Sequence, residues 1–349
     1  MRLATPGTRF TRLPGSDADR PPEARGIARD QVRLLVSRPS GITHAAFAEL
    51  GDYVEAGDLL VVNNSATIAA AVDGRRRGEP IAVHFSTSLD DGSWVVELRP
   101  PGRATGHLDD VAVGDWIELP DGAGLLVRES FPMPGRAGSR LWRARVAVEV
   151  AVPAYLERVG RPIRYAYVPD PWPLAAYQTV FAAVPGSAEM ASAARPFTTD
   201  LVTALVSRGI AVAPVTLHAG VSSAEAGEPP APERYAVPAA TAQLVNLTRA
   251  NGRRVIAVGT TATRALETAA GATGSVTAAT GWTDLVLGPE RGTRVVDGIV
   301  TGWHDAGASH LLLLEAVAGL EVVQPAYAAA VASGYLWHEF GDSALLLRR

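Results

Sequence analysis

The periodicity of this chain changes twice, and that change constrains the fold more than any single motif. Between about residues 73 and 150 the sequence consists of short segments rich in Val, Ile and Trp, such as 81–88, 93–100 and 123–130. Turn clusters such as Asp-Asp-Gly-Ser and Pro-Asp-Gly-Ala-Gly separate them. Several short strands at this spacing predict a small antiparallel barrel or sandwich.

Outside this stretch, strand-like and helix-like segments alternate, which predicts an α/β domain. Residues 57–72 contain the apolar run of a buried strand. After Pro153 the sequence favours strands at 210–220 and 254–260 and helices at 198–210, 238–252, 260–271, 309–320 and 325–335. A chain of 349 residues exceeds the usual size of one core. We therefore expect a larger α/β domain built from 27–72 and 151–349, an inserted small antiparallel β-barrel domain at 73–150, and a partly ordered N-terminal arm at 1–26.

Composition excludes several classes of site and of location. The chain has no cysteine, so it has neither disulfides nor thiolate ligands nor a Cys nucleophile. Its net charge of −4 argues against a generally basic nucleic-acid binder, and we interpret the one tight basic run, 75–77, as a solvated hairpin loop. The N-terminus lacks the apolar segment of a secretory signal and no run of 18 apolar residues occurs, so we expect a cytoplasmic protein without membrane contact.

The segment Arg254–Thr268, RVIAVGTTATRALET, is the first candidate binding element. It predicts a strand that ends at Gly259, Thr260 and Thr261 and leads into a helix. Unpaired N–H groups in the first turn of a helix bind carboxylates and phosphates, although either threonine can instead cap the helix. The chain has neither Gly-x-Gly-x-x-Gly nor a P-loop lysine, so neither a dinucleotide nor a nucleoside triphosphate is indicated.

Arg264 and Glu267 follow this turn on one face of the expected helix. Three residues apart, they suit an ordinary ion pair. In the alternative interpretation Arg264 holds a carboxylate of a ligand and Glu267 holds an amine or a hydroxyl.

Two histidines, His218 and His304, stand at the ends of expected strands. Ligands of α/β sheets gather beyond the carboxyl ends of strands, so both histidines and the Gly-Thr-Thr turn are candidates for one shared site. No zinc-binding histidine spacing occurs, and a Ser-His-Asp hydrolase lacks its Gly-x-Ser-x-Gly elbow.

Taken together, several segments resemble the S-adenosylmethionine:tRNA ribosyltransferase-isomerase family of the queuosine pathway. The resemblance runs in the same order from about residue 22 to the C-terminus. It is carried by GDLLVVNNS (57–65), YQTVFAAVPGS (177–187), VTLHAG (215–220), RRVIAVGTTATRALET (253–268), GWTDLVLGP (281–289), RVVDGIVTGWH (294–304) and FGDSALLL (340–347). It implies an α/β domain with an inserted β-barrel.

The resemblance also implies a reaction. Members transfer the ribosyl part of S-adenosylmethionine to the aminomethyl group of a 7-deazaguanine in tRNA. Adenine and methionine leave, the sugar becomes an epoxy-cyclopentenediol, and no metal takes part. We expect a monomer that binds S-adenosylmethionine through Gly259, Thr260, Thr261, Arg264, Glu267, Asn63, Tyr177 and Gln178. His218 and His304 are candidates for proton transfer or base contact, and Glu233 for orienting the amine nucleophile.

This chain departs from the family pattern at several polar positions. Where the family has Asn-Asp-Thr-Arg, residues 63–66 are Asn-Asn-Ser-Ala; segment 191–198 lacks a histidine, segment 228–233 lacks two, and segment 304–309 lacks a lysine. Lost cations weaken attraction to nucleic acid. Three hypotheses therefore stay open: the usual tRNA reaction, a divergent paralogue that uses or cleaves S-adenosylmethionine with a small acceptor, and a non-catalytic binding protein.

Overall fold

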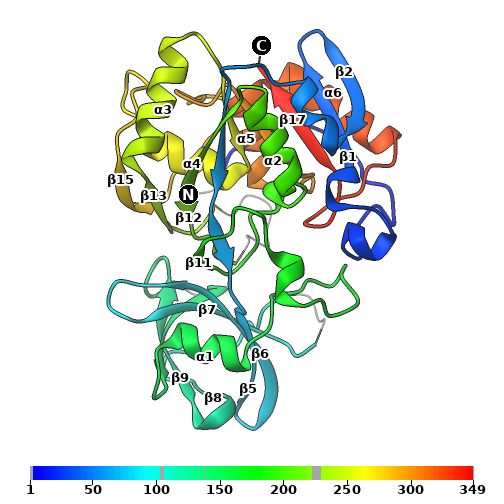
Figure 1. Ribbon diagram of the computed structural model, residues 1–349. Helices are drawn as coiled ribbons and strands as arrows, with labels where there is room; N and C mark the ends of the chain where they lie inside the picture. The colour runs from blue at the N-terminus through cyan, green and yellow to red at the C-terminus, as the bar shows by residue number, and fades with distance from the viewer. Residues whose placement is uncertain (1–2, 103–105, 137, 222–228, 349) are drawn as a thin grey trace.

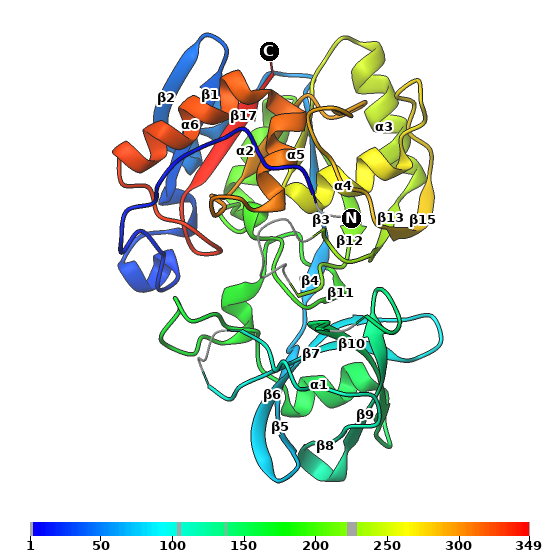
Figure 2. The same ribbon diagram turned by 180° about the vertical axis from the view of Figure 1, so that it is seen from behind.

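The computed structural model describes residues 3–102, 106–136, 138–221 and 229–348. Figure 1 shows an α/β part at the top and a closed barrel at the bottom. The chain passes between them through β3 (Leu59–Asn63) and β4 (Ser65–Thr67), which are labelled in Figure 2. The mixed α/β fold with an inserted antiparallel barrel is therefore confirmed. Among the described residues, no helix combines the length and apolar character needed to cross a membrane.

A nine-stranded mixed sheet forms the centre of the α/β part, with four neighbouring parallel strands in its middle. In spatial order its strands are β15 (Ala279–Thr283), β13 (Glu233–Val237), β12 (Ala211–Leu217), β3 (Leu59–Asn63), β14 (Val255–Val258), β16 (Gly298–Thr301), β17 (Ser343–Leu347), β1 (Arg33–Arg38) and β2 (Gly41–Ala46). Because β12, β3, β14 and β16 run in one direction, their carboxyl ends lie at the same edge of the sheet.

Helices cover both faces of this sheet. One face carries α3 (Ala239–Ala250), α4 (Thr260–Ala269), α5 (Ser309–Ala318) and α6 (Leu320–Ala332), and the other carries α2 (Thr199–Ser207), as the opposite views of Figures 1 and 2 show. Successive side chains of β3 alternate between the two cores: Leu59 and Val61 pack on the α3–α6 side, Leu60 and Val62 on the α2 side. Burial on both faces explains why this strand is apolar throughout.

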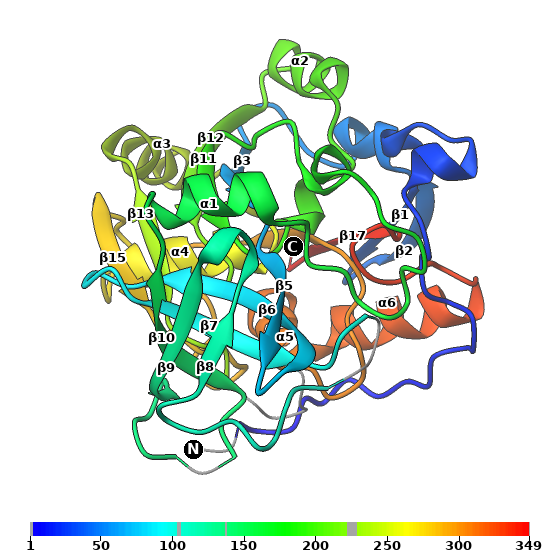
Figure 3. The same cartoon turned by 90° about the horizontal axis from the view of Figure 1, so that it is seen from below.

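The barrel closes in the order β10 (Leu141–Ala147), β7 (Trp94–Arg99), β6 (Glu79–Ser88), β5 (Ala71–Arg76), β8 (Trp116–Glu118) and β9 (Gly124–Phe131). Helix α1 (Val152–Val159) lies beside it in Figure 3 and packs Tyr155 and Leu156 into the barrel core. A small sheet of β4 (Ser65–Thr67) and β11 (Val184–Ser187) joins the two parts. Short 3₁₀ helices lie at Pro22–Arg25, Arg29–Gln31, Phe47–Asp52, Pro120–Gly122, Leu174–Tyr177 and Ser192–Ala194.

The structure refines the expectations for one helix, the basic run and the N-terminal segment. Helix α6 begins at Leu320, five residues before the expected start, and continues through Pro325. The basic run lies at the β5–β6 hairpin, but Arg76 is buried and pairs with Asp110 and Asp115 rather than being solvated. The N-terminal segment is fixed at Thr8, whose backbone and hydroxyl both donate to Glu315.

Candidate active site

A cavity of about 860 Å³ lies where the four parallel strands end. Its lining comes from both parts of the chain, including Ser86 and Arg99 of the barrel and Thr260, Arg264 and His304 of the α/β part. The strand ends bring together positions far apart in sequence, as expected for open α/β sheets. The volume is typical of small-molecule sites.

The Gly-Thr-Thr turn forms one wall of this cavity. Gly259 has φ of +94°, a conformation that L side chains rarely adopt, and serves as the N-cap of α4. Neither Thr260 nor Thr261 caps the helix through its side chain, so the capping alternative is wrong. Both threonines line the cavity. The positive end of the α4 dipole therefore faces it.

Asn63 fixes this turn from behind. Its amide nitrogen donates to the Thr261 hydroxyl at 3.1 Å and to the Leu217 carbonyl at 2.8 Å, and its oxygen accepts from the Leu217 N–H at 3.0 Å. It is fully buried and is not among the residues that line the cavity. Asn63 thus joins the ends of β3, β12 and α4.

Arg264 pairs with Glu233, and not with Glu267. Its Nη1 donates to the Glu233 carboxylate, while Nε and Nη2 donate to the carbonyls of Leu285 and Thr283 at 3.1 and 3.3 Å. Glu233 also accepts from the Gly220 N–H at 3.1 Å. Both charged residues line the cavity, so their pairing places a guanidinium and a carboxylate side by side.

Glu267 occupies a structural position rather than the expected ligand-binding one. Its buried carboxylate accepts from the backbone N–H groups of Arg294, Val295 and Val296 at 2.8–3.1 Å and pairs with Arg291 at 3.3 Å. It is not among the lining residues. Residue spacing could not show this, because the partners lie 24 to 29 residues further along the chain.

His304 lies in the cavity wall stacked on His310. The ring centroids are 4.4 Å apart and the interplanar angle is 2°. Nε2 of His304 contacts the Thr301 hydroxyl at 3.1 Å. Burial lowers the pKa of His304 well below its usual value and that of His310 to about 4. Both imidazoles are therefore neutral at pH 7.

His218 follows β12, as expected, but its ring is held away from the cavity surface. Its Nδ1 contacts the Ser65 hydroxyl at 2.7 Å, and Gly186 packs so closely that a Cβ there would lie 2.5 Å from Nδ1. The neighbouring Ala219 and Gly220 line the cavity, whereas His218 does not. Burial lowers the pKa of His218 as well.

Tyr177 and Gln178 are adjacent but differ in placement. Tyr177 is 4% exposed and lines the cavity. Gln178 instead exchanges two hydrogen bonds with the backbone of Thr67, at 3.0 and 2.8 Å, and so anchors the 3₁₀ helix Leu174–Tyr177 to β4.

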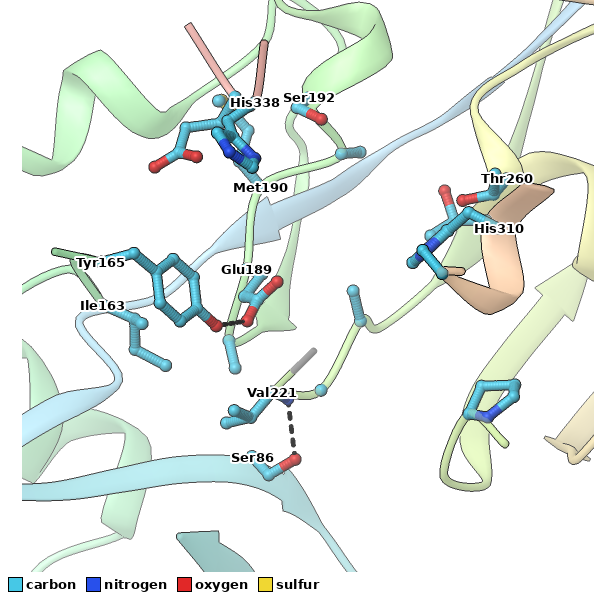
Figure 4. A pocket seen from close by; sticks show the side chains of 18 of the residues that line it. Ser86, Ile163, Tyr165, Glu189, Met190, Ser192, Val221, Thr260, His310 and His338 are labelled. Atoms are coloured by element: carbon cyan, nitrogen blue, oxygen red, sulfur yellow. Dashed lines mark hydrogen bonds between the residues drawn. The ribbon is translucent and has the colours of Figure 1, made fainter. Parts of the chain in front are cut away.

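Sequence reasoning missed one wall of the cavity, which we call the acidic wall: Tyr165, Tyr167, Glu189, His338 and Glu339. Figure 4 shows Tyr165 and Glu189 joined by a hydrogen bond and lying across the pocket from Thr260 and His310. The sequence offers two weak indications of this wall: the Tyr-x-Tyr pair at 165–167, and the His-Glu pair at 338–339 shortly before Gly341 and Asp342.

The comparisons with known proteins agree with this architecture. The sequence pattern described as "Queuosine biosynthesis protein" matches residues 10–346. The chain belongs to this family. A relative named S-adenosylmethionine:tRNA ribosyltransferase-isomerase from Acidiphilium cryptum is 36% identical, covering 92% of this chain and 93% of the relative.

A second relative of the same name, from Moorella thermoacetica, is also 36% identical, over 96% of this chain and 97% of its own. A crystal structure of S-adenosylmethionine tRNA ribosyltransferase from Thermotoga maritima matches with a TM-score of 0.53 and 27% identity. It covers 97% of this chain and 99% of that one. The similarity to queuosine biosynthesis proteins therefore extends over both parts of the molecule.

Two of the departures from the family pattern have structural partners here. Ser65, in the altered 63–66 segment, joins the hydroxyl of Ser187 to the ring of His218 through two contacts of 2.7 Å. Arg195, in the altered 191–198 segment, is buried and pairs with Glu23 at 2.9 Å. Glu228 of the third altered segment lies outside the described residues. Within the described chain no group of three or more His, Asp or Glu residues is arranged to hold a metal ion.

Proposed function

We propose that this chain transfers the ribosyl part of S-adenosylmethionine to 7-aminomethyl-7-deazaguanine in tRNA and isomerises it, releasing adenine and methionine. The observation that carries the proposal is the convergence of four parallel strand ends and the α4 N-terminus on one cavity, in a chain similar over its whole length to proteins named for this reaction.

S-adenosylmethionine binds, in this proposal, with its methionine carboxylate at Gly259, Thr260 and Thr261. The helix N-terminus supplies N–H donors and a partial positive charge to an anion. Arg264 adds a full positive charge beside this turn, and Glu233 is held next to it by their ion pair. Tyr177 lines the remainder of the pocket, while Asn63 and Gln178 act by holding the backbone.

A neutral histidine serves as the base in this proposal. The reaction needs a base that removes a proton from the carbon next to the sulfonium, and a neutral imidazole accepts one. His304, stacked on His310 in the cavity wall, fits this role. We assign His218 a positioning role, because it contacts Ser65 and does not line the cavity.

We propose that the protein acts as a monomer. Sedimentation equilibrium at the concentrations used for the activity assay tests this: the mass of one chain is expected, and the mass of two chains would contradict it.

The proposal is tested by adenine release. The protein is incubated with S-adenosylmethionine alone, with unmodified tRNA, and with tRNA that carries the aminomethyl-deazaguanine, and free adenine is measured by mass spectrometry. We expect release only in the third mixture. Release without tRNA would identify an S-adenosylmethionine-cleaving paralogue, and no release in any mixture would favour a binding protein.

A further inference from the structure

The acidic wall has an organisation that the proposed roles above do not use. The rings of Tyr165, Tyr167 and His338 form a stack, with centroids 5.9 and 4.1 Å apart and interplanar angles of 23° and 12°. Glu189 accepts a hydrogen bond from the Tyr165 hydroxyl and Glu339 accepts one from the Tyr167 hydroxyl. The wall thus offers two carboxylates at the edge of an aromatic stack.

A desolvated carboxylate normally requires a cation, but Glu339 forms no salt bridge with any residue of the described chain. Its described partners are the Tyr167 hydroxyl and its own backbone N–H. Burial raises the pKa of Glu339 to about 7. Two arginines lie nearby but are engaged elsewhere: Arg195 donates to Glu23 and to the Ala176 carbonyl, and Arg164 donates to the carbonyls of Val168 and Pro169.

An independent observation comes from Tyr177. Its ring packs against Phe340, the neighbour of Glu339, with centroids 5.1 Å apart. Although the residue is 4% exposed, its hydroxyl has no hydrogen-bond partner among the described residues. Burial, followed by the charge of Glu339, raises the pKa of this tyrosine. A buried polar group without a partner costs about 1–3 kcal/mol, so its place in the cavity lining points to a ligand.

The backbone holds this wall in a special conformation. His338 has φ of +69°, which is uncommon for a residue other than glycine. Its ring is fixed by contacts with Asp17 at 2.8 Å and Arg12 at 3.0 Å. Such conformations cluster at functional sites, and this one turns His338 and Glu339 toward the cavity.

We propose that the acidic wall is a binding subsite for a primary ammonium group, with Glu339 and Glu189 as its anionic partners and the Tyr177 hydroxyl as an additional acceptor. An ammonium has three N–H donors and no acceptor, which matches two carboxylates and a free hydroxyl oxygen. The aromatic stack adds attraction for a cation. The two carboxylates would repel an anion at this wall.

If the proposed function holds, two ammonium groups enter this cavity. The inference that the wall binds an ammonium rests on the proposed function only for which molecule carries that group. One is the aminomethyl group of the acceptor base, and the other is the amino group of the methionine part of S-adenosylmethionine. Thr260 and the acidic wall lie on opposite sides of the pocket (Figure 4). This placement favours the acceptor, because the carboxylate and the amine of methionine share one carbon atom and would lie on the same side.

The experiment measures binding without turnover. Wild type, Glu339→Gln and Glu189→Gln are titrated by calorimetry with free 7-aminomethyl-7-deazaguanine and, separately, with S-adenosylmethionine. Glu118→Gln, an exposed strand residue of the barrel, is the matched control. The neutral 7-methyl-7-deazaguanine measures what the ammonium contributes, and thermal melting verifies that each variant is folded.

We expect each cavity variant to bind the aminomethyl base at least tenfold more weakly, with the methyl base and the Glu118→Gln control unaffected. Loss of S-adenosylmethionine affinity instead would assign the subsite to the methionine amine. Two outcomes would overturn the inference. In the first, folded variants bind both ligands with unchanged affinity. In the second, the wild type does not prefer the aminomethyl base over the methyl base, and the variants bind S-adenosylmethionine as the wild type does. If Glu339→Gln does not fold, Tyr167→Phe and Glu189→Gln give the same comparison. Because no adenine is measured, this result is independent of the test of the proposed function.

Discussion

At the scale of single residues, the polar positions that resemble the family fall into two kinds. Thr260, Thr261 and Arg264 face the cavity, whereas Asn63 and Glu267 are buried and bind backbone groups. Both kinds are polar residues within apolar sequence. A pattern of residue types therefore identifies them as important but does not separate a ligand contact from an internal support.

Arg264 is the residue whose role is most directly testable. Arg264→Ala should weaken S-adenosylmethionine binding at least about tenfold, because a charge-assisted hydrogen bond to the ligand carboxylate is lost. Calorimetry measures this change. The same substitution also leaves Glu233 without its cation, so the single variant alone does not separate the two effects.

The double variant Arg264→Ala/Glu233→Ala resolves this ambiguity. If Arg264 contacts the ligand, the double variant stays as weak as Arg264→Ala. Recovery of wild-type affinity in the double variant would mean that Arg264 serves only to neutralise Glu233, since the cycle isolates the coupling of the pair.

At the scale of elements, the connection from β14 to α4 determines where the ligand is expected to lie. Gly259 accommodates a positive φ at the point where the strand becomes a helix, and its N–H donates to the Val300 carbonyl at 2.8 Å. The turn therefore holds the first residues of α4 against the neighbouring strand β16.

Gly259→Ala should cost stability and also reduce ligand affinity. Gly259 has φ of +94° and ψ of 160°, a conformation essentially restricted to glycine that costs another residue about 1–3 kcal/mol, and the new Cβ would lie 3.3 Å from that of Ala193. Gly252→Ala is the matched control, because Gly252 also has a positive φ, of +68°, but has no heavy atom within 4 Å of a new Cβ. Chemical denaturation should show a loss of stability for both variants, larger for Gly259→Ala, whereas calorimetry should show weaker S-adenosylmethionine binding for Gly259→Ala alone. If Gly259→Ala and Gly252→Ala bind S-adenosylmethionine with equal affinity, the turn does not contact the ligand.

Elements with strong periodicity were predictable from sequence. The apolar run before Gly259 and the helical pattern after it gave β14 and α4, and the turn-separated Val-rich segments gave the barrel. The start of α6 was missed because Pro325 appeared to begin a helix that in fact starts at Leu320. Proline is tolerated there at the cost of one backbone hydrogen bond, which neighbouring packing offsets.

At the scale of the whole molecule, the cavity exists because the barrel closes over the carboxyl edge of the sheet. Its lining combines Ser86 of the barrel, Thr260 of the sheet edge and Glu339 near the C-terminus. The acidic wall could not be foreseen, since segments around residues 165, 189 and 338 meet only through tertiary packing. Neither the hydrophobic periodicity of a segment nor the spacing of its residues predicts such a contact.

The central claim is that this cavity joins the ribosyl part of S-adenosylmethionine to a tRNA base. Isotope tracing tests it most directly: S-adenosylmethionine labelled with ¹³C in the ribose, or in the methyl group, is incubated with the protein and tRNA bearing the aminomethyl-deazaguanine. The tRNA is then digested and its nucleosides are analysed by mass spectrometry. We predict that the ribose label appears in the modified nucleoside and the methyl label does not. Methyl label in the tRNA, or ribose label confined to small molecules, would contradict the account.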